Sequence, residues 1–147
     1  KDQEAAQRAL DFHLGWFADP IWTGDYPSRM RTVCGRRLPT FTEAERTLIK
    51  GSSDFFGLNH YGTAYVTSPE WRGYAWSGYG DLRAGSYFTD LGVDMLGDQR
   101  WSQTDMGWGV VPWGIRRTCE YIHSTYHPRG GIIITENGCA VREDRAE

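Results

Sequence analysis

The sequence predicts an α/β protein, and in particular part of a (β/α)8 barrel that is incomplete on its own. Two runs have the composition of strands, "DFFGLNHY" at residues 54–61 and "GIIITE" at residues 131–136, and a helical pattern lies between them. This alternation implies a parallel sheet with right-handed crossovers. The run at 131–136 is apolar throughout, which is typical of a parallel strand covered on both faces. Because a complete barrel needs roughly 200 residues or more, the 147 residues hold only some of its units.

The first third of the chain predicts a helix, a loop and a second, shorter helix. Asp2 is a candidate N-cap for a helix that ends at Pro20, because the residue before a proline is pushed out of the helical conformation. The apolar positions of this helix share one face: Ala5, Ala9, Phe12 and Trp16, with Ala6, Leu10 and Phe17 alongside. Residues 21–39 contain the glycines and prolines of a loop. Residues 42–45 form a capping-box pattern that opens the short helix, and Gly51 is placed to end it.

The rest of the chain predicts a long connection and one more helix. Residues 62–107 show little periodicity, and a structureless connection of that length in a compact domain is usually a functional lid or a wrong assignment. Pro112 suits the first turn of a helix, and Pro128 lies just beyond its expected end. The buried stripe of this helix is expected to consist of Ile115, Cys119, Ile122 and Tyr126.

Composition and charge restrict the possible partners. The net charge of −3 and the pI of about 5.8 give no basic surface, so nucleic acid is not expected as a partner. No apolar run approaches the roughly 20 residues that span a bilayer. We therefore expect a soluble protein without a membrane span. The cytoplasm is favoured over secretion, but the sequence establishes neither the compartment nor the oligomeric state.

Aromatic and cysteine residues give two further indications. The aromatic fraction is 14%, which is high, and it predicts either a large core or flat apolar surfaces that stack on ligands. Cys34, Cys119 and Cys139 lie far apart without CxxC spacing. Such a set argues against a disulfide scaffold and against a structural zinc site, so we predict neither a metal nor a cofactor.

Both predicted strands carry polar residues at their carboxyl ends. Asn59, His60 and Tyr61 end the first strand, and Glu136 and Asn137 end the second. In open α/β sheets and in (β/α)8 barrels this end of the strands is where ligands bind. Glu136 is therefore expected to leave the apolar layer and to enter a cavity.

Four stretches of the chain resemble the signature segments of glycoside hydrolase family 1. They are "DFHLGWFADPIWTGDYPSRM" (11–30), "DFFGLNHYGT" (54–63), "MGWGVVPWGI" (106–115) and "ITENG" (134–138), and they occur in the family's order. The family includes the β-glucosidases, β-galactosidases, 6-phospho-β-glycosidases and myrosinases, which act in carbohydrate metabolism. The resemblance implies a (β/α)8 barrel that hydrolyses O-glycosidic bonds by a retaining mechanism, through a covalent glycosyl-enzyme intermediate.

The resemblance also implies that residues 1–147 are a single partial catalytic domain, truncated at both ends. They correspond to roughly units five to seven of the barrel, and we place strand five near residues 20–24. The family carries its acid/base carboxyl in a Thr-x-Asn-Glu-Pro segment, and this sequence contains no such segment. The family's C-terminal stretch that grips the outer hydroxyls of the sugar is not found in it either.

The matching positions carry the family's roles onto four residues. Glu136 matches the nucleophile, Tyr61 the tyrosine that orients it, Asn59 the polar residue beside the sugar and Trp108 the tryptophan at the aglycone side. The implied substrate is a β-linked glucoside or a related glycoside. The chemistry of the residues agrees, because a carboxylate that attacks an anomeric carbon must be ionised and needs donors such as a tyrosine hydroxyl. A second carboxyl roughly 5 Å away should act first as acid and then as base.

Each of these residues also has a structural interpretation. Glu136 could cap the next helix, which is the commoner fate of a glutamate after a strand. Tyr61 could be a core tyrosine with a satisfied hydroxyl. Trp108 and Trp113 could both anchor loops; we assign ligand contact to Trp108 and a structural role to Trp113. No histidine or basic residue lies within the motif beside Cys139, so this thiol is interpreted as structural.

Other polar residues, and the protein as a whole, leave alternatives open. His13 is interpreted as packed or partly exposed rather than as a ligand. Asp25 and Arg29 are interpreted as loop-ordering residues, since Asp, Tyr and Pro favour turns. The alternative to an enzyme is a catalytically incomplete sugar-binding protein or a truncated barrel without activity. We expect residues 1–147 alone to be inactive.

Overall fold

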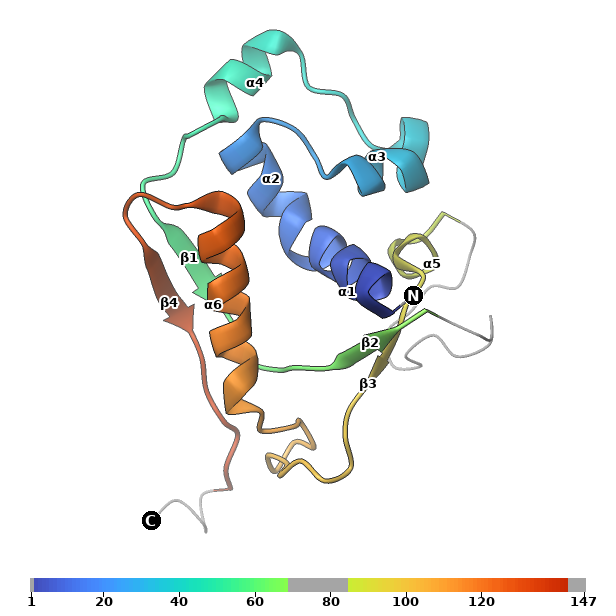
Figure 1. Ribbon diagram of the computed structural model, residues 1–147, viewed down its shortest axis with the longest axis vertical. Helices are drawn as coiled ribbons and strands as arrows, with labels where there is room; N and C mark the ends of the chain where they lie inside the picture. The colour runs from blue at the N-terminus through green and yellow to red at the C-terminus, as the bar shows by residue number, and fades with distance from the viewer. Residues whose placement is uncertain (1, 69–84, 143–147) are drawn as a thin grey trace. The chain divides into compact units, whose positions relative to one another are not determined.

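The computed structural model (Figure 1) describes residues 2–68 and 85–142, which fall into two units. Residues 1–52 and 65–96 form the helical unit, and residues 53–64 and 97–147 form the parallel-strand unit. Both names refer to the described residues of each unit. None of the helices in the described ranges combines the length and the apolar character that a membrane crossing requires.

The parallel-strand unit contains the predicted pair of strands. β1 (Phe56–Asn59) and β4 (Ile132–Glu136) run parallel to each other. Figure 1 shows them side by side, with α6 (Pro112–Tyr126) running along them. The rings of Phe56 and Tyr126 stack with their centroids 5.7 Å apart, so the C-terminal turn of the helix packs on the beginning of β1. Both predicted strands are therefore confirmed with shorter bounds, and so is their parallel pairing.

The helix α6 follows the prediction closely. Pro112 occupies its first turn, and His127 ends it in the left-handed conformation with φ 47°. Of the predicted stripe, Ile122 and Tyr126 are buried, whereas the two positions nearer the N-terminus are half-buried. Amphipathic periodicity and a proline at each end are local signals, and they were sufficient here.

The apolar run in β4 predicts a strand with other elements packed on both of its faces. The described residues of this chain do not bury both faces. Ile133 and Ile134 are 47% and 41% exposed. Among the described residues β4 pairs with β1 alone, so one edge of the strand and part of its surface have no neighbour there. The composition of the strand therefore matches a more enclosed environment than residues 2–68 and 85–142 provide.

The helical unit begins with an almost continuous helical path that corrects two predictions. α1 (Asp2–Leu10) passes through a π-helical turn (Asp11–Gly15) into α2 (Trp16–Thr23). The helix therefore does not end at Pro20, and the strand placed near 20–24 is wrong because helix occupies those residues. A proline inside a helix costs about 3 kcal/mol, but Pro20 is buried, and its packing offsets that cost.

Residues 21–39, predicted as loop, also contain helix. α3 (Ser28–Cys34) and a short 3-10 turn (Gly35–Arg37) lie within that range. Met30 on α3 is 1% exposed, which shows that burial of an apolar residue in the core stabilises this short helix. The glycines and prolines of the segment mark only where it begins and ends.

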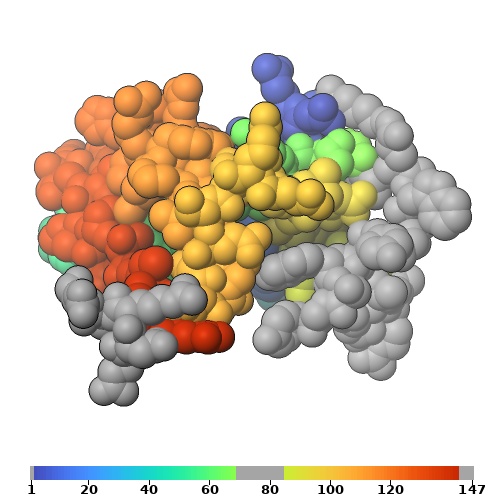
Figure 2. Space-filling model, turned by 90° about the horizontal axis from the view of Figure 1, so that it is seen from below, coloured from blue at the N-terminus to red at the C-terminus, as the bar shows by residue number. Residues whose placement is uncertain are grey.

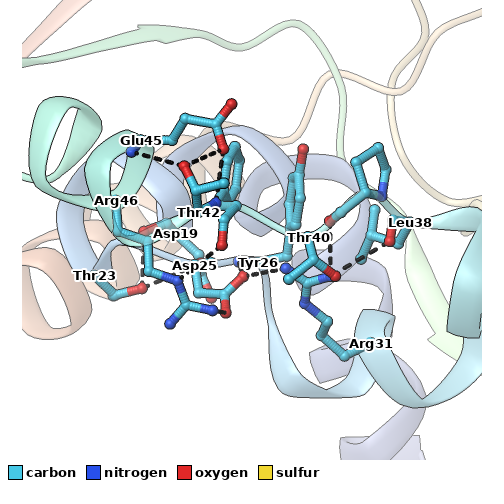
Figure 3. A network of polar contacts seen from close by, with 12 residues as sticks. Asp19, Thr23, Asp25, Tyr26, Arg31, Leu38, Thr40, Thr42, Glu45 and Arg46 are labelled. Atoms are coloured by element: carbon cyan, nitrogen blue, oxygen red, sulfur yellow. Dashed lines mark hydrogen bonds and ion pairs between the residues drawn. The ribbon is translucent and has the colours of Figure 1, made fainter.

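The capping box predicted at Thr42 is confirmed. α4 (Glu43–Ile49) begins with the Glu45 amide donating to Thr42 Oγ1 at 3.3 Å, and the Thr42 amide donating to Glu45 Oε2 at 2.7 Å (Figure 3). These reciprocal bonds satisfy amides that have no partner within the helix. Gly51 follows the helix with φ 73°, as expected for a residue that ends it.

The long connection predicted at 62–107 contains regular structure. β2 (Tyr65–Thr67) and β3 (Asp94–Leu96) pair antiparallel, and α5 (Tyr87–Leu91) lies between them in the chain. The assignment as one structureless connection is therefore wrong. The lid interpretation falls partly on residues 69–84, which lie outside the described residues.

A single apolar cluster forms the core of the helical unit. Its buried members are Ala9, Phe12, Met30, Leu38 and Leu91. The guanidinium of Arg8 ties α1 to the end of α5 by donating to the carbonyls of Leu91 at 2.7 Å and Gly92 at 2.6 Å. His13 is exposed and its Nδ1 lies 2.8 Å from the hydroxyl of Tyr87, in line with its interpretation as a partly exposed packing residue.

Asp25 orders the loop between α2 and α3, as interpreted from the sequence. Its carboxylate accepts hydrogen bonds from the Tyr26 amide at 2.8 Å, from Arg31 at 2.5 Å and from Arg46 at 2.8 Å (Figure 3). One carboxylate thus links the loop to α3 and α4. Arg29 pairs instead with Asp11, at 3.2 Å.

Candidate active site

The carboxyl ends of β1 and β4 meet at a β-bulge. The register is regular up to Leu58 opposite Ile134, and then Asn59 lies opposite Glu136, so Thr135 has no partner of its own. A bulge redirects the side chains that follow it, and such irregularities are common beside active sites. The bulge places Glu136 directly across from Asn59.

Glu136 has a hydrogen-bond donor close by. The hydroxyl of Tyr61 donates to Glu136 Oε2 at 3.0 Å. Because the Glu136 carboxylate accepts this bond, the pKa of Tyr61 is raised, and burial and the negative charge of Glu136 raise it further. The phenol therefore keeps its proton and remains a donor across the neutral pH range. Both side chains are exposed, so a ligand can approach them.

Asn59 is held by the residue at the bulge. Thr135 Oγ1 donates to Asn59 Oδ1 at 2.6 Å. Thr135 also lies beside Gly57, where an added Cβ would be 3.6 Å from the threonine methyl. Gly57 and Asn59 share one face of β1, and Tyr61 follows just beyond the end of the strand. Consecutive residues of β4, Thr135 and Glu136, thus contact Asn59 and Tyr61 respectively.

Two further hydrogen bonds join the chain after β1 to the end of β4. The His60 amide donates to the carbonyl of Glu136 at 3.0 Å, and Asn137 Nδ2 donates to the carbonyl of His60 at 2.6 Å. These bonds fix the backbone on both sides of Glu136. The imidazole of His60 is half-buried, and this burial lowers its pKa although a backbone hydrogen bond acts in the opposite direction.

Trp108 is presented by a small hairpin that precedes α6. The Thr104 amide donates to the Trp108 carbonyl at 2.8 Å, and the Trp108 amide donates to Thr104 Oγ1 at 3.1 Å. Gly107 occupies the turn with φ 81°, a conformation that glycine adopts without steric cost. Gln103 and Gly109 form an antiparallel bridge that closes the hairpin.

The hairpin and the chain after β4 border the carboxylate. The rings of Trp108 and Tyr61 meet edge to face with centroids 6.3 Å apart. The Asp105 amide donates to the carbonyl of Ala140 at 3.0 Å, and the Arg142 amide donates to Asp105 Oδ2 at 2.6 Å. In Figure 2 the red surface of the chain after β4 accordingly lies against the yellow-orange surface that precedes α6.

A cavity of about 310 Å³ opens beside the strand ends, and its lining includes Tyr61, His60, Thr63 and Cys139. The thiol of Cys139 is free and exposed. Thr63 lies so close to α6 that a Cβ at Gly114 would be 1.8 Å from the threonine hydroxyl. Glycine at 114 is therefore required for the strand end and the helix to approach each other.

The other acidic side chains described in the parallel-strand unit are either bonded elsewhere or lie at the opposite end of β1. Asp98 pairs with Arg100, whose hydrogen bond lowers the pKa of Asp98 to about 2. Glu120 pairs with two arginines on α6, and Asp105 accepts from the Arg142 amide. Asp54 precedes β1, at the end of the strand opposite to Asn59. Among the described residues of this unit, none of these acids forms a hydrogen bond or ion pair with Glu136, so they leave one carboxylate at this site.

All four residues predicted for the site lie in the parallel-strand unit. Tyr61 contacts both Glu136 and Trp108, and Asn59 faces Glu136 across the strand pair. Trp113 packs edge to face on Trp101 with centroids 6.1 Å apart, in keeping with its structural interpretation. Sequence reasoning missed Thr135, and it counted Asn137 among the polar residues at the strand end without giving it a role. The signal for both was their position on either side of a charged strand end.

Comparisons with known proteins assign the chain to a family. A family model described as glycosyl hydrolase family 1 matches residues 1–147. The raucaffricine-O-β-D-glucosidase of Rauvolfia serpentina is 42% identical over 142 residues, which cover 93% of this chain and 25% of that protein. The lactase-like protein of Homo sapiens is 38% identical over 151 residues, which cover 95% of this chain and 25% of that protein.

Solved structures agree with these matches. A rice β-glucosidase mutant in a covalent complex with Glc superposes with a TM-score of 0.81 at 35% identity, over 99% of this chain and 30% of that one. A β-glucosidase from Trichoderma harzianum superposes with a TM-score of 0.75 at 33% identity, over 95% of this chain and 28% of that one. The chain thus spans about a quarter of the length of the curated relatives it matches. These neighbours are TIM barrels, and the prediction of a partial barrel is confirmed.

Proposed function

Because the chain belongs to glycosyl hydrolase family 1, we propose that it is one part of the catalytic domain of a retaining β-glycosidase of the β-glucosidase type. The remainder of the barrel lies outside residues 1–147 in this proposal, and we call the complete barrel the full-length enzyme. The observation that carries the proposal is the hydrogen bond from Tyr61 to Glu136, 3.0 Å long, at the carboxyl ends of two parallel strands. In barrels of this type, that end holds the active site.

Glu136 is the nucleophile in the first step. Its carboxylate attacks the anomeric carbon, a carbon–oxygen ester bond forms, and the bond from that carbon to the aglycone oxygen breaks. The departing oxygen takes a proton from a second carboxyl group. Tyr61 holds Glu136 in one orientation through its hydrogen bond, and because it is a neutral donor it leaves the negative charge of the carboxylate in place.

Water completes the reaction in the second step. The second carboxyl, now a carboxylate, takes a proton from the water as its oxygen attacks the anomeric carbon, and the bond to Glu136 breaks. This group lies outside residues 1–147 in our proposal, because the other described acids of the parallel-strand unit are bonded elsewhere or, in the case of Asp54, precede β1 at the end opposite to the site. The product keeps the configuration of the substrate, since two inversions follow each other.

Asn59 and Trp108 bind the substrate. Asn59 lies opposite Glu136 in the strand register, which supports a role for its amide beside the sugar ring that Glu136 attacks. Trp108 is 47% exposed and contacts the ring of Tyr61. A flat exposed aromatic ring next to the nucleophile offers a stacking surface for the aglycone.

Covalent trapping of the full-length enzyme tests the nucleophile. A 2-deoxy-2-fluoro-β-glucoside with a dinitrophenyl leaving group should glycosylate the carboxylate, with release of dinitrophenolate, and the glycosyl-enzyme should then hydrolyse slowly, so that the sugar remains attached. Trypsin cleaves after Arg129 and Arg142, and in peptide 130–142 the only carboxylate is Glu136. We expect the added mass on this peptide, with fragment ions that place it at Glu136 and loss of the label under mild base. Glu136→Gln is the matched control and should remain unlabelled.

Other outcomes of the trapping experiment count against the proposal. A label on Cys139, which lies in the same peptide, would be a thioglycoside and would resist mild base. A label elsewhere in the chain would remove Glu136 from the nucleophile's role. Sugar binding without any label or turnover would favour the alternative of a sugar-binding barrel without activity.

Residues 1–147 alone should not hydrolyse cellobiose. Without a carboxylic acid to protonate it, an unactivated leaving group departs far too slowly. The exposed isoleucines of β4 also favour association over a rigid pocket. Glucose release would be measured for the purified chain and for the full-length enzyme, with a nitrophenyl glucoside alongside because its leaving group needs no acid. Cellobiose turnover by the monomeric chain at the rate of the full-length enzyme would show that a second carboxyl in this chain acts at the site.

A further inference from the structure

We propose that Thr135 is a positioning residue that acts through Asn59, and this inference rests on the proposed function. Thr135 is the residue without a partner at the bulge between β1 and β4. Its hydroxyl donates to Asn59 Oδ1 at 2.6 Å. We infer that this bond fixes the rotation of the Asn59 amide, so that the NH2 group points to the sugar hydroxyl next to the anomeric carbon.

The bulge is what makes the contact possible. In a regular strand successive side chains point to opposite faces, and Thr135 would then face away from Glu136. Because the register slips between Leu58 and Asn59, Thr135 reaches Asn59 at the end of β1, and Glu136 reaches Tyr61 just beyond it. One local irregularity therefore places the nucleophile and the holder of a neighbouring amide side by side.

The chemistry of an amide gives the bond its significance. Asparagine presents a carbonyl acceptor at one end and an NH2 donor at the other, and rotation by half a turn exchanges them. Thr135 occupies the acceptor end. Among the described residues, no acceptor is bonded to the NH2 end of Asn59, and the side chain is exposed. The donor is therefore free for a ligand that binds beside Glu136.

Gly57 lies beside Thr135 across the strand pair. An added Cβ there would lie 3.6 Å from the methyl and 3.7 Å from the hydroxyl of Thr135, which are ordinary van der Waals distances. Alanine at 57 should therefore leave the bond from Thr135 to Asn59 intact.

Such a donor matters most in the transition state. Positive charge develops at the anomeric carbon, and hydrogen bonds to the adjacent 2-hydroxyl strengthen as the reaction proceeds. A donor that is already oriented loses no rotational freedom when it makes this bond. Removing the orientation should therefore lower kcat more than it raises KM.

The test compares Thr135→Val with Thr135→Ser in the full-length enzyme. Valine has nearly the same shape but no hydroxyl, whereas serine keeps the donor. Each variant is assayed on 4-nitrophenyl β-glucoside and on its 2-deoxy analogue. We expect T135V to lower kcat/KM on the glucoside about tenfold to hundredfold, which is the size of losing a strong hydrogen bond. On the 2-deoxy analogue, T135V and the unaltered enzyme should differ little in kcat/KM. T135S keeps the donor and should therefore keep most of the activity that T135V loses. Thr118→Val is the control: it removes a hydroxyl that bonds to its own helix and should behave like the unaltered enzyme.

Variants of Asn59 provide a second test of the proposal, which is needed if T135V folds poorly. Asn59→Asp keeps an acceptor for Thr135 but has no NH2 donor, so it should lose activity on the glucoside and much less on the 2-deoxy analogue. T135V added to Asn59→Ala should cost nothing more, because Thr135 acts through that amide. Thermal unfolding and circular dichroism of each variant report whether the fold is intact.

Three results would overturn the positioning role. Equal losses on both substrates in T135V would mean that the hydroxyl serves the strand and not the amide. Additive losses in T135V with Asn59→Ala would mean that Thr135 acts elsewhere, and an Asn59→Asp variant with normal glucoside activity would mean that the donor is not used. Failure of the proposed function is distinct from these, since the unaltered full-length enzyme would then show neither turnover nor a label on Glu136.

Discussion

The two units of the chain treat their carboxylates in opposite ways. In the helical unit Asp25 pairs with Arg31 and Arg46, and Asp90 pairs with Arg37. In the parallel-strand unit Glu136 has a tyrosine as its donor, and no arginine or lysine pairs with it among the described residues. A guanidinium neutralises a carboxylate and occupies its oxygens, whereas a neutral hydroxyl orients it and leaves its charge. Asp25, which is paired with arginines, therefore supports the structure, whereas Glu136, whose donor is a neutral tyrosine, keeps a charged carboxylate that is available for chemistry.

Burial differs between the units in the same sense. Phe12 and Met30 in the helical unit are 2% and 1% exposed, whereas Tyr61 and Trp108 in the other unit are 46% and 47% exposed. Apolar burial is the main source of stability. Substitutions in the helical unit should therefore change the free energy of unfolding, and substitutions at the strand ends should change the rate of reaction.

The largest effect is expected for Glu136→Gln in the full-length enzyme. The change conserves volume and removes the nucleophile, so kcat should fall by at least about 10⁴-fold, as when other enzymes lose a nucleophile. Circular dichroism and thermal unfolding should be unchanged. Azide should partly restore turnover to Glu136→Gly, with inversion of configuration at the anomeric carbon. Near-normal kcat in Glu136→Gln would show that the reaction does not pass through this residue.

Phe12→Ala should have the largest effect in the helical unit. Removing a fully buried aromatic ring costs about 3–5 kcal/mol of unfolding free energy, because the core of Phe12, Met30 and Leu38 is left with a cavity. Hydrogen–deuterium exchange should rise more in peptides from residues 2–52 than in those from 97–142. The activity of the folded fraction should change little. Equal increases in both sets of peptides would mean that the two units unfold together.

The sequence predicted the elements whose signals are local. The helix α6 has a proline at each end and an apolar stripe, and α4 has its capping box, so neighbouring residues determine both. The continuation of α2 through Pro20 and the short helix around Met30 depend on burial among residues distant in the chain. Periodicity cannot show such burial, and this is why a strand near 20–24 and a loop at 21–39 were predicted there.

The candidate site shows the same division. Glu136 and Tyr61 could be selected because each lies at the carboxyl end of a recognisable strand in a recognisable motif. The bulge at Thr135 could not, since a register shift depends on two strands that lie far apart in the sequence. The interaction of Thr135 with Asn59 is a consequence of that shift, so only the folded chain reveals it.

Tyr61→Phe should have a smaller effect than Glu136→Gln. It removes one hydrogen bond to a charged group, which costs roughly 1.5–3 kcal/mol, and kcat should fall about 10- to 100-fold. Because the pKa of Tyr61 is raised by Glu136, the hydroxyl stays protonated below pH 10 and its ionisation should not shape the pH profile in that range. Tyr65→Phe in the helical unit is the matched control. A change in kcat of less than about twofold in Tyr61→Phe would show that the hydroxyl is not used in the reaction.

The smallest effect is expected for Asp25→Asn, and it should depend on pH. Burial alone would raise the pKa of Asp25, but hydrogen bonds from Arg31 and Tyr26 and the charges of Arg31 and Arg46 lower it below the ordinary value of 3.8. A carboxylate whose pKa is lower in the folded state contributes stability above its unfolded pKa and loses that contribution as pH falls through its folded pKa. Asp25→Asn should thus reduce stability by about 1 kcal/mol at pH 7, since the network is partly exposed to solvent. At pH 2 the difference in stability between the two proteins should be smaller, because the contribution of the carboxylate is lost as pH falls through its folded pKa. The difference in unfolding free energy is measured by urea unfolding at pH 7 and pH 2, with pulsed hydrogen exchange in peptides of α3 and α4 as the readout. The kcat at pH 7 should be unchanged. A loss of the same size at pH 2 would show that the side chain acts through its shape and not its charge.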